Sequence, residues 1–445
     1  MYFLYSLLIL AFGVLASPYL LYQAIRYKKY IGSLGQRMGY LPVSFNLDAE
    51  ESIWIHAVSV GEVLTARALI PDLRRRYPKL RVFLSTTTMA GQQVARRNVH
   101  DVDAVFYFPF DLAFIVRRTL RLVKPRLFVM METEIWPNLL HACRKLGVKT
   151  MMVNGRISSR SYPRYRLVRA LFRKVLADVN RFCVQSEESA RRLIDLGADP
   201  SRVVVTGSLK FDSLEAPGAG KVGRPRDRVL RFFRMNPARP VIVAGSTLRG
   251  EEASVLRAFR RIKSATSSPL LVLAPRHAER FGEVAQLARD AAFVTARRSE
   301  LPIDAEPRAE VIVLDTLGEL AELYQVATAV FVGGSLANAG GHNILEPAIF
   351  GRPIVFGPHM QNFAEIAETF LAHGAAIQVR SEHELEDALV SLLTDPVRRA
   401  KLGAAARALV ESNRGAKDKT LAVIDQVLPA RGAPMGVVRP FRVVH

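Results

Sequence analysis

The fold is decided by the stretch Phe331-Val-Gly-Gly-Ser-Leu-Ala-Asn-Ala-Gly-Gly-His-Asn-Ile-Leu-Glu-Pro347. The apolar run 327–332 predicts a buried strand, the glycines after it predict a loop, and 343–350 predicts the start of a helix. Glycines let a backbone approach a ligand closely, and a helix N-terminus attracts an anion. Glu346, one turn into this helix, is suited to accept the two hydroxyls of a ribose. The alternative is an ordinary strand–turn–helix connection, but His342-Asn343 followed by Glu346 favours a nucleotide-phosphate site.

Composition limits the partners and the compartment. With 445 residues, the chain is long enough for two domains, each with its own core. The 62 basic and 41 acidic residues give a net charge of +21, which favours polyanions such as nucleic acid, an anionic membrane or phosphorylated substrates. Cys143 and Cys183 provide neither a disulfide framework nor a metal quartet, which fits a reducing compartment. No two histidines lie at ligand spacing with a third partner, so no metal site is predicted.

The N-terminus predicts a membrane anchor. Residues 1–25 carry no charged side chain, and Arg26, Lys28 and Lys29 follow. About 20 apolar residues suffice to cross a bilayer, and basic residues on this flank would keep the rest of the chain in the cytoplasm. A cleaved signal peptide is the competing interpretation, but the segment lacks a basic start. Pro18 leaves open whether the helix spans the membrane or lies in its interface.

Apolar runs alternate with amphipathic stretches, which predicts βα units and parallel sheets. The Gly- and Pro-rich stretch 214–225 marks a boundary between two domains. The predicted strands of the first half are 53–56, 82–85, 127–131, 149–153, 182–184 and 203–206, and those of the second are 241–244, 270–273, 311–314, 329–332, 354–356 and 376–379.

The expected organisation follows from these runs. It is an anchor (1–25), an N-terminal domain (30–213), a linker (214–228), a C-terminal domain (229–428) and a mobile tail (429–445). Doubly wound domains bind ligands at the carboxyl ends of their strands, so we expect the site in a cleft between the two domains.

Three acidic residues follow predicted strands of the first half. The motif His56-Ala-Val-Ser-Val-Gly-Glu62 places Glu62 in the first turn of a helix. A carboxylate there is suited to accept a proton from an attacking hydroxyl, although the helix dipole alone also favours an acid. The motif Met131-Glu-Thr-Glu-Ile-Trp-Pro-Asn138 places Glu132 and Glu134 at a second strand end, where the alternative is a helix cap.

Basic and glycine-containing turns follow other strands. Lys210, in Thr206-Gly-Ser-Leu-Lys-Phe-Asp212, comes after the last strand of the first half, and Arg276 follows strand 270–273. Either cation is suited to a phosphate, but a lysine on so basic a chain is equally a solvated surface group. Leu317-Gly-Glu319 forms a further strand-to-helix turn, so the second half carries three turns of a nucleotide-binding type.

Taken in order, these motifs resemble those of the bacterial 3-deoxy-D-manno-octulosonic acid (Kdo) transferases, from the N-terminus to about residue 425. The resemblance implies an α/β fold of the GT-B class, with two doubly wound Rossmann-like domains facing a cleft and an N-terminal membrane anchor helix. It implies that Glu62 is the proton acceptor and that Glu132 and Lys210 stabilise the transition state. It implies that 30–213 is an acceptor-binding domain and 229–428 a CMP-sugar-binding domain. It assigns CMP binding to Pro275, Arg276, Leu317, Gly318, Glu319, Asn343, Ile344, Leu345 and Glu346.

The same resemblance implies the reaction. Kdo moves from CMP-Kdo to a lipid A precursor, lipid IVA, in lipopolysaccharide biosynthesis, in one displacement that inverts the anomeric centre. Because cations and a helix N-terminus would serve the departing phosphate, neither a metal nor a cofactor is expected. The expected partners are CMP-Kdo, the lipid A precursor and the anionic membrane, with no nucleic acid and no obligate protein partner. The expected location is the cytoplasmic face of the cell inner membrane.

Two other functions stay open at the level of sequence. One is a GT-B transferase that uses a UDP-sugar and another lipid-linked acceptor. The other is a membrane-anchored nucleic-acid-binding protein, which the charge suggests but which leaves the acids at strand ends unexplained. The segment 160–174 interleaves arginines with aromatic and apolar side chains. It is suited to a membrane surface or a phosphorylated lipid, or equally to an ordinary helix with a solvated basic face.

Overall fold

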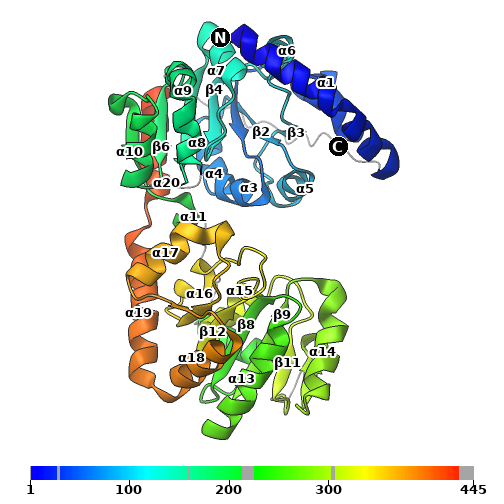
Figure 1. The fold of residues 1–445 in the computed structure, drawn as a ribbon, viewed down its shortest axis with the longest axis vertical. Helices are drawn as coiled ribbons and strands as arrows, with labels where there is room; N and C mark the ends of the chain where they lie inside the picture. The colour runs from blue at the N-terminus through cyan, green and yellow to red at the C-terminus, as the bar shows by residue number, and fades with distance from the viewer. Residues whose placement is uncertain (1, 28–30, 159–160, 213–224, 302–305, 430–445) are drawn as a thin grey trace. The chain divides into compact units, whose positions relative to one another are not determined.

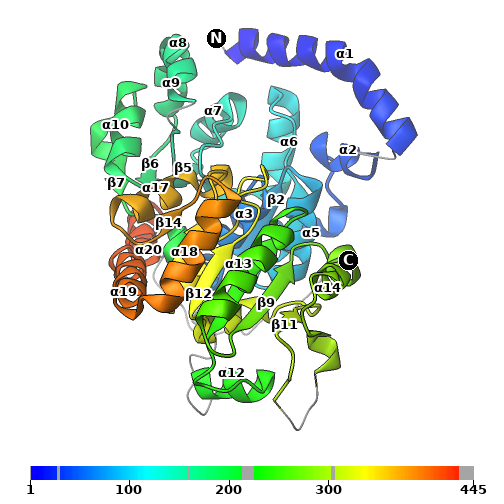
Figure 2. The same cartoon turned by 60° about the horizontal axis from the view of Figure 1, so that its bottom comes forward.

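The computed structural model describes residues 2–27, 31–158, 161–212, 225–301 and 306–429. It forms two units (Figures 1 and 2): Met1–Ser213 together with Arg414–His445, and Leu214–Asn413. Arg160, residues 214–224 of the expected linker and residues 430–445 of the expected tail lie outside the described residues. The end of the expected linker, 225–228, is helical, because α12 (Pro225–Phe233) begins there.

The N-terminal unit is built on a parallel sheet in the order β3-β2-β1-β4-β5-β6-β7. The strand order reverses between β1 and β4, which is the topology of a doubly wound sheet. Helices cover both faces, so the central strands are buried on both sides and have continuous apolar sequences. The strands are β1 (Ser52–His56), β2 (Arg81–Thr86), β3 (Ala104–Tyr107), β4 (Pro125–Met131), β5 (Lys149–Gly155), β6 (Arg181–Val184) and β7 (Val203–Val205).

Two cores lie on the two faces of this sheet. Helices α3, α4, α5 and α20 contribute to one core, and α6, α7, α9 and α10 contribute to the other. The helices of the unit are α1 (Tyr2–Tyr27), α2 (Ile31–Arg37), α3 (Val60–Arg67), α4 (Ile70–Arg76), α5 (Met89–Asn98), α6 (Ala113–Val123), α7 (Pro137–Lys145), α8 (Tyr162–Leu167), α9 (Arg169–Leu176), α10 (Glu187–Asp195), α11 (Leu209–Asp212) and α20 (Ala416–Val427).

The last helix, α20, corrects the expected end of the C-terminal domain. Residues up to 428 were expected there, but α20 belongs to the N-terminal unit. Leu421 and Ile424 are buried in the same core as Ile53 of β1. The hydroxyl of Tyr77 also donates to Oδ1 of Asp425 (2.7 Å). The sequence shows that 416–427 has an apolar stripe, but it does not show which sheet covers that stripe.

The C-terminal unit has a second parallel sheet, in the order β10-β11-β9-β8-β12-β13-β14. Its strands are β8 (Val241–Thr247), β9 (Leu270–Pro275), β10 (Thr295–Arg297), β11 (Val311–Val313), β12 (Ala329–Val332), β13 (Ile354–Phe356) and β14 (Ile377–Gln378). The helices after α12 are α13 (Glu251–Ala265), α14 (Phe281–Asp290), α15 (Leu320–Leu323), α16 (Leu345–Ala348), α17 (Ala364–Ala372), α18 (Glu382–Thr394) and α19 (Pro396–Ser412).

Two doubly wound units confirm the expected α/β class, and every predicted strand is present with shifts of a few residues at its ends. Two strands, β3 and β10, were missed. Both lie at the edge of their sheet, and most of their side chains are half-exposed. A short edge strand buries little, so it leaves a weaker apolar pattern than a central strand.

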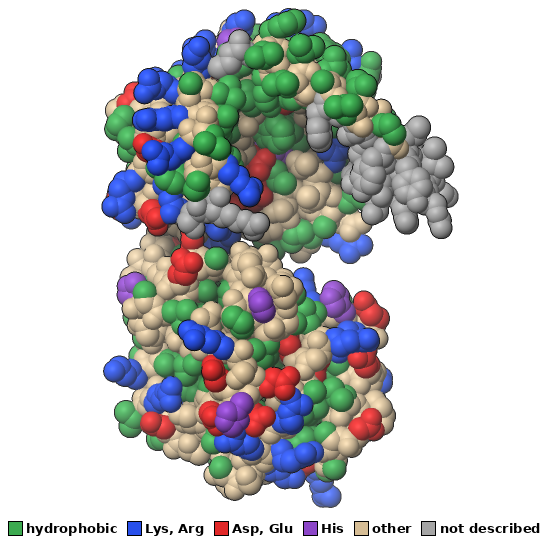
Figure 3. Space-filling model, in the orientation of Figure 1, with side chains coloured by type: hydrophobic (Ala, Val, Ile, Leu, Met, Phe, Trp, Pro, Cys, Tyr) green, Lys and Arg blue, Asp and Glu red, His purple; other side chains and the backbone are tan. Residues whose placement is uncertain are grey.

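The expected anchor segment lies in α1. Within the described residues, no helix combines the length and the apolar character needed to cross a membrane. The first turns of α1 contact the unit: the ring of Tyr2 stacks on His141 (3.9 Å), and the amide of Asn138 donates to Ser6 (2.9 Å). Apolar side chains gather on the surface over α1 (Figure 3). Among the side chains of α1 that the structure describes, the large exposed ones are Phe3, Leu4, Leu7, Leu8, Leu10, Val14 and Leu15.

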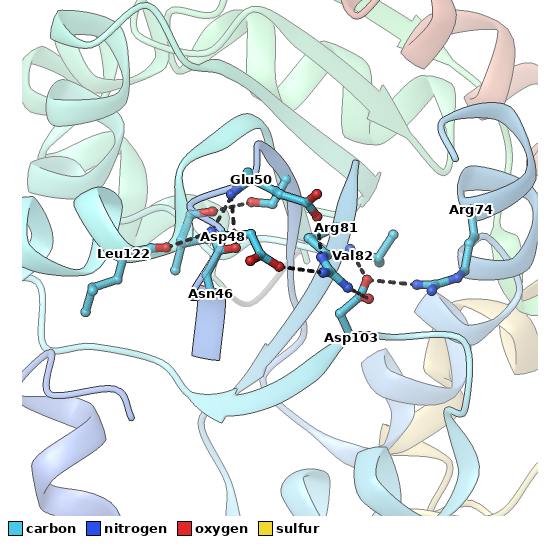
Figure 4. Close-up of polar contacts among 10 residues, drawn as sticks. Asn46, Asp48, Glu50, Arg74, Arg81, Val82, Asp103 and Leu122 are labelled. Carbon is cyan, nitrogen blue, oxygen red and sulfur yellow. Dashed lines mark hydrogen bonds and ion pairs between the residues drawn. The ribbon is translucent and has the colours of Figure 1, made fainter. Parts of the chain in front are cut away.

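A polar network fixes the amino ends of β2 and β3 (Figure 4). Arg81 opens β2 and donates to the carboxylates of Glu50 (2.6 Å) and Asp103 (3.0 Å). Asp103 precedes β3 and also accepts bonds from the N–H of Val82 (2.8 Å) and the guanidinium of Arg74 (2.8 Å). This network therefore stabilises the short edge strand at the sheet edge opposite the carboxyl ends of the strands.

Candidate active site

Strands β1 and β4 of the N-terminal unit end where the strand order reverses. His56 of β1 pairs with Met130 of β4, so the segments after them leave the same edge of the sheet. Glu62 comes from the first segment, and Glu132 and Glu134 come from the second. The charges of the other two acids both act on Glu134, so the structure brings the three predicted acids together. This edge is where doubly wound sheets bind ligands.

Glu62 lies in the first turn of α3 and is 8% exposed. Its Oε2 accepts the N–H of Val58 (2.9 Å), and its Oε1 accepts the hydroxyl of Ser59 (3.0 Å). Burial raises the pKa of Glu62 to about 7, and the charge of Glu132 adds to this rise while the two hydrogen bonds oppose it. The carboxylate therefore caps a helix and also has a pKa suited to accepting a proton near neutral pH.

Glu132 is held in an uncommon backbone conformation, with φ of +52°. Its N–H donates to the carbonyl of Val153 (2.9 Å). Its Oε1 lies 3.5 Å from Nζ of Lys210. The two residues that the resemblance pairs as transition-state stabilisers thus form an ion pair. Residues in strained backbone regions concentrate at functional sites, where the surrounding structure holds them.

Lys210 lies on α11, which is fixed at both ends. Asn154, at the end of β5, is fully buried and accepts the N–H of Leu209 (3.0 Å) through Oδ1. At the other end, Asp212 accepts the N–H of Gly415 (2.8 Å), just before α20. The position of Lys210 therefore depends on a residue near the C-terminal end of the described chain, which the sequence alone did not indicate.

His56 is the last residue of β1, and its ring stacks on Phe108 (3.8 Å). Its Nδ1 is 3.0 Å from the hydroxyl of Ser85, and its Nε2 is 4.0 Å from Oε2 of Glu134. Burial lowers the pKa of His56 to about 3, so the ring is neutral at physiological pH. Burial also raises the pKa of Glu134 to about 7, and the charge of Glu62 raises it further. The contact between His56 and Glu134 is therefore polar rather than an ion pair.

In the C-terminal unit, the strand order reverses between β8 and β12. The glycine-rich loop after β12 was expected to offer its backbone to a ligand. Its N–H groups at 334–337 instead donate to the carboxylate of Glu251, so this part of the loop is not an open anion site. The helix expected over 343–350 is also shorter, since α16 spans only Leu345–Ala348.

The later part of the loop places the predicted acid beside the predicted cation. Asn343 accepts the N–H of Leu345 (3.1 Å) and donates to Oε1 of Glu346 (3.1 Å). Burial raises the pKa of Glu346, while the bond from Asn343 and the charge of Arg276 lower it. Glu346, Asn343 and Arg276 therefore form one neighbourhood at the ends of β9 and β12, as expected.

The turn Leu317-Gly-Glu319 follows β11, two strands from β8 along the same edge. Leu317 is 85% exposed, and Gly318 has φ of +89°, a conformation that favours glycine. The carboxylate of Glu319 faces the guanidinium of Arg298 (3.2 Å) and accepts the hydroxyl of Thr316. The remaining predicted residues lie deeper: Pro275 ends β9, and Ile344 and Leu345 are buried.

Three further residues at this edge had no predicted role of their own, although His342 belongs to the motif that predicted the nucleotide site. The Tyr324 hydroxyl packs against Gly245, where an added Cβ would lie 2.2 Å from it. His342 packs on Gly334, and burial, with the charge of Arg276 adding, lowers the pKa of its ring to about 4. The third is Glu251. Its indication in the sequence is Gly245-Ser-Thr-Leu-Arg-Gly-Glu-Glu252, a glycine and two acids directly after a buried strand.

Metal chemistry has no evident site in the part of the chain that the structure describes. No group of three or more His, Cys, Asp or Glu side chains there could hold a metal ion. The candidate chemistry consists of acids, a lysine and hydrogen bonds in the N-terminal unit, and of a guanidinium and a carboxylate in the C-terminal unit.

Comparison with known proteins gives the family. A model of the 3-deoxy-D-manno-octulosonic-acid transferase (kdotransferase) family matches residues 32–213. The 3-deoxy-D-manno-octulosonic acid transferase of Haemophilus influenzae is 32% identical over 96% of this chain and 98% of that protein. The Bordetella pertussis transferase is 34% identical over 84% and 87%. The fold is similar to that of UDP-GlcNAc 2-epimerase from Neisseria meningitidis (TM-score 0.57, 12% identity, 84% of this chain and 100% of that one). The chain therefore belongs to the 3-deoxy-D-manno-octulosonic acid transferase family of glycosyltransferases.

Proposed function

We propose that this glycosyltransferase moves Kdo from CMP-Kdo to a hydroxyl of a lipid A precursor, lipid IVA, with inversion and without a metal. The observation that carries the proposal is the group formed by Glu62, Glu132 and Lys210. It combines a buried acid with a pKa of about 7 and a neighbouring carboxylate–ammonium pair, at the sheet edge where such folds bind ligands.

The proposed step is a single displacement. The acceptor oxygen forms a bond to the anomeric carbon of Kdo, while the bond from that carbon to the phosphate oxygen of CMP breaks. The electron pair leaves with CMP, and the hydroxyl proton passes to Glu62. Lys210 and Glu132 stabilise charge that develops as the bonds exchange. Attack opposite the leaving group inverts the anomeric centre.

The C-terminal unit supplies the proposed CMP site. Arg276 suits the phosphate, because a guanidinium forms charge-assisted hydrogen bonds with its oxygens, and Glu346 suits the ribose hydroxyls. The other proposed CMP-binding residues are Pro275, Leu317, Gly318, Glu319, Asn343, Ile344 and Leu345.

Arg276→Ala and Glu346→Ala should each weaken CMP binding about ten- to a hundredfold, since hydrogen bonds to charged groups contribute about 1.5–3 kcal/mol. Titration calorimetry with CMP measures this change. Arg407→Ala, which removes a solvated pair with Glu411 on α19, is the matched control and should leave the affinity unchanged. If all three variants bind CMP as tightly as the wild type does, neither Arg276 nor Glu346 belongs to the site.

The reaction itself is tested by incubating the protein with CMP-Kdo and tetra-acylated lipid A precursor. Mass spectrometry should show the acceptor heavier by one or more Kdo units, with release of CMP. A parallel incubation with UDP-sugars tests the competing donor. Release of UDP and no CMP would replace the proposed donor with a UDP-sugar.

We also propose that the protein works at the cytoplasmic face of the inner membrane, with α1 as its contact to lipid. Two observations support this location: the exposed apolar side chains of α1 and the net charge of +21, which favours an anionic surface.

A further inference from the structure

Glu251, at the edge of the C-terminal sheet, accepts five backbone hydrogen bonds. It opens α13, directly after the turn that follows β8, and is 2% exposed. Its Oε2 accepts the N–H groups of Leu248 (2.9 Å) and Gly334 (2.8 Å). Its Oε1 accepts those of Ser335 (3.0 Å), Leu336 (2.9 Å) and Ala337 (3.1 Å).

Consecutive backbone N–H groups that converge in this way form a concavity that binds anions. Here the anion belongs to the protein. All five contacts bring donors to the two oxygens, which is the pattern of an ionised carboxylate acting only as acceptor. The segment 334–337 is thus held by an internal charge and needs no ligand to order it.

The segment that Glu251 fixes is the support for the proposed CMP-binding residues. The N–H of Gly341 donates to the carbonyl of Gly334 (2.8 Å), which ties the second half of the loop to the first. The ring of His342 lies on Gly334, where an added Cβ would be 2.9 Å away. Asn343 and Glu346 follow directly. A shift of 334–337 would therefore move these groups.

We propose that Glu251 is a positioning residue for the nucleotide: its carboxylate acts as a built-in anion that holds 334–337 and so sets the place of 341–346. It touches no substrate and acts through the loop. This role rests on the proposed CMP site in the C-terminal unit.

The first test needs no substitution. In the unliganded protein, single-residue amide exchange at 334–337 should already be slow, and CMP should leave it unchanged while it protects amides within 341–346. If the amides at 334–337 are unprotected until CMP binds, the carboxylate is not holding the loop and the proposal is wrong. If CMP does not bind at all, the proposed CMP site fails, whereas slow exchange at 334–337 still establishes the internal anion.

The second test compares Glu251→Gln with Glu252→Gln, its neighbour on α13. Glu252 is also buried, but it pairs with Arg280 (2.7 Å) rather than with the loop. Both variants should melt at lower temperature. Only Glu251→Gln should speed exchange at 334–337 and weaken CMP binding, by about tenfold or more. Equal loss of CMP affinity in both variants, or none in Glu251→Gln despite faster exchange, would overturn the proposal. If Glu251→Gln does not fold, Glu251→Asp takes its place. It retains the charge, so it should lose less CMP affinity than is expected for Glu251→Gln. A CMP affinity equal to that of the wild type would count against the role.

Discussion

At Glu62, the hydrogen bonds that cap a helix also hold a buried carboxylate in place. The carboxylate accepts bonds from Val58 and Ser59, as a structural cap would. It differs from a solvated cap by its burial, which is the largest cause of its raised pKa. The sequence offered a cap and a base as alternatives. The two hydrogen bonds match the cap, and the raised pKa is compatible with the proposed role of base.

Glu62→Gln should therefore lose turnover while the protein keeps its fold. Removal of a general base typically lowers a rate by about 10²–10⁴, while CMP affinity should not change. Glu384→Gln is the matched control, because Glu384 accepts the N–H of Arg380 (2.7 Å) in the same cap geometry but is exposed. The control should lower stability by about 0.3–1 kcal/mol at most with normal turnover. Near-normal Kdo transfer by Glu62→Gln would move the role of base to another acid.

The pH dependence should report the two acids with raised pKa values. Both Glu62 and Glu134 have a pKa of about 7 in the folded protein, against an ordinary 4.5. A base must be ionised to act, so kcat/KM should rise with pH through an apparent pKa near 7, which belongs to the coupled pair. Glu134→Gln should keep this rise but shift it to lower pH, because a neighbouring negative charge is gone. Loss of the rise in Glu134→Gln would assign the base to Glu134.

The stability of the folded protein should fall as the pH rises, opposite to the predicted rise of kcat/KM. A raised carboxyl pKa means that the folded state binds the proton more tightly than the unfolded state does. The stabilisation of the folded state by this proton binding is complete below about pH 4.5 and is lost as the pH rises through about 7. Thermal melts of wild type at pH 5 and pH 8 should show this loss, and it should be smaller in Glu134→Gln. An equal loss in both proteins would mean that Glu134 does not contribute.

At the scale of the element, prediction from sequence succeeded where burial is complete. The strands β1, β4, β8 and β12 are buried on both faces, so their apolar runs identified them and the acids or glycines that follow. It failed for β3 and β10, which bury little, and for α20, whose covering sheet is distant in sequence. The role of Glu251 also escaped, because five backbone donors from two loops meet there only in the folded chain.

The assignment of α20 can be tested through Ile424, which is fully buried in a core of the N-terminal unit. Ile424→Ala should lower the free energy of unfolding by about 2–5 kcal/mol. Amide exchange should accelerate in β1 and β2. Val397→Ala, at an exposed position of α19, should change neither quantity. Faster exchange in β8 and β12 with β1 unaffected would mean that α20 stabilises the other unit.

At the scale of the whole molecule, the chain combines a large positive charge with an apolar surface on its first helix. Composition predicted an anionic partner without distinguishing a membrane from a nucleic acid. Family membership makes the chain a Kdo transferase, whereas the nucleic-acid alternative left the acids at the strand ends unexplained. The apolar side chains of α1 could be counted in the sequence, but which of them the unit covers required the structure.

These two features predict two separable parts of membrane binding. The charge should bind vesicles that contain anionic lipid and should lose effect as salt rises, because the screening length falls from about 10 Å at 0.1 M to about 3 Å at 1 M. The exposed leucines should contribute a part that salt does not remove, since a fully buried leucine side chain is worth about 1.5–3 kcal/mol. Co-sedimentation with anionic and neutral vesicles at both salt concentrations measures the two parts.

Leu4→Gln with Leu8→Gln should weaken the salt-resistant part and leave the salt-sensitive part. Both side chains are exposed on α1, away from the contacts of Tyr2 and Ser6 with the unit. Val397→Gln replaces an exposed apolar side chain on α19 and should bind vesicles like wild type. If the double variant binds as strongly as wild type at 1 M salt, α1 is not the contact with lipid. If binding to anionic vesicles does not fall with salt, the positive charge of the chain does not draw the enzyme to the membrane.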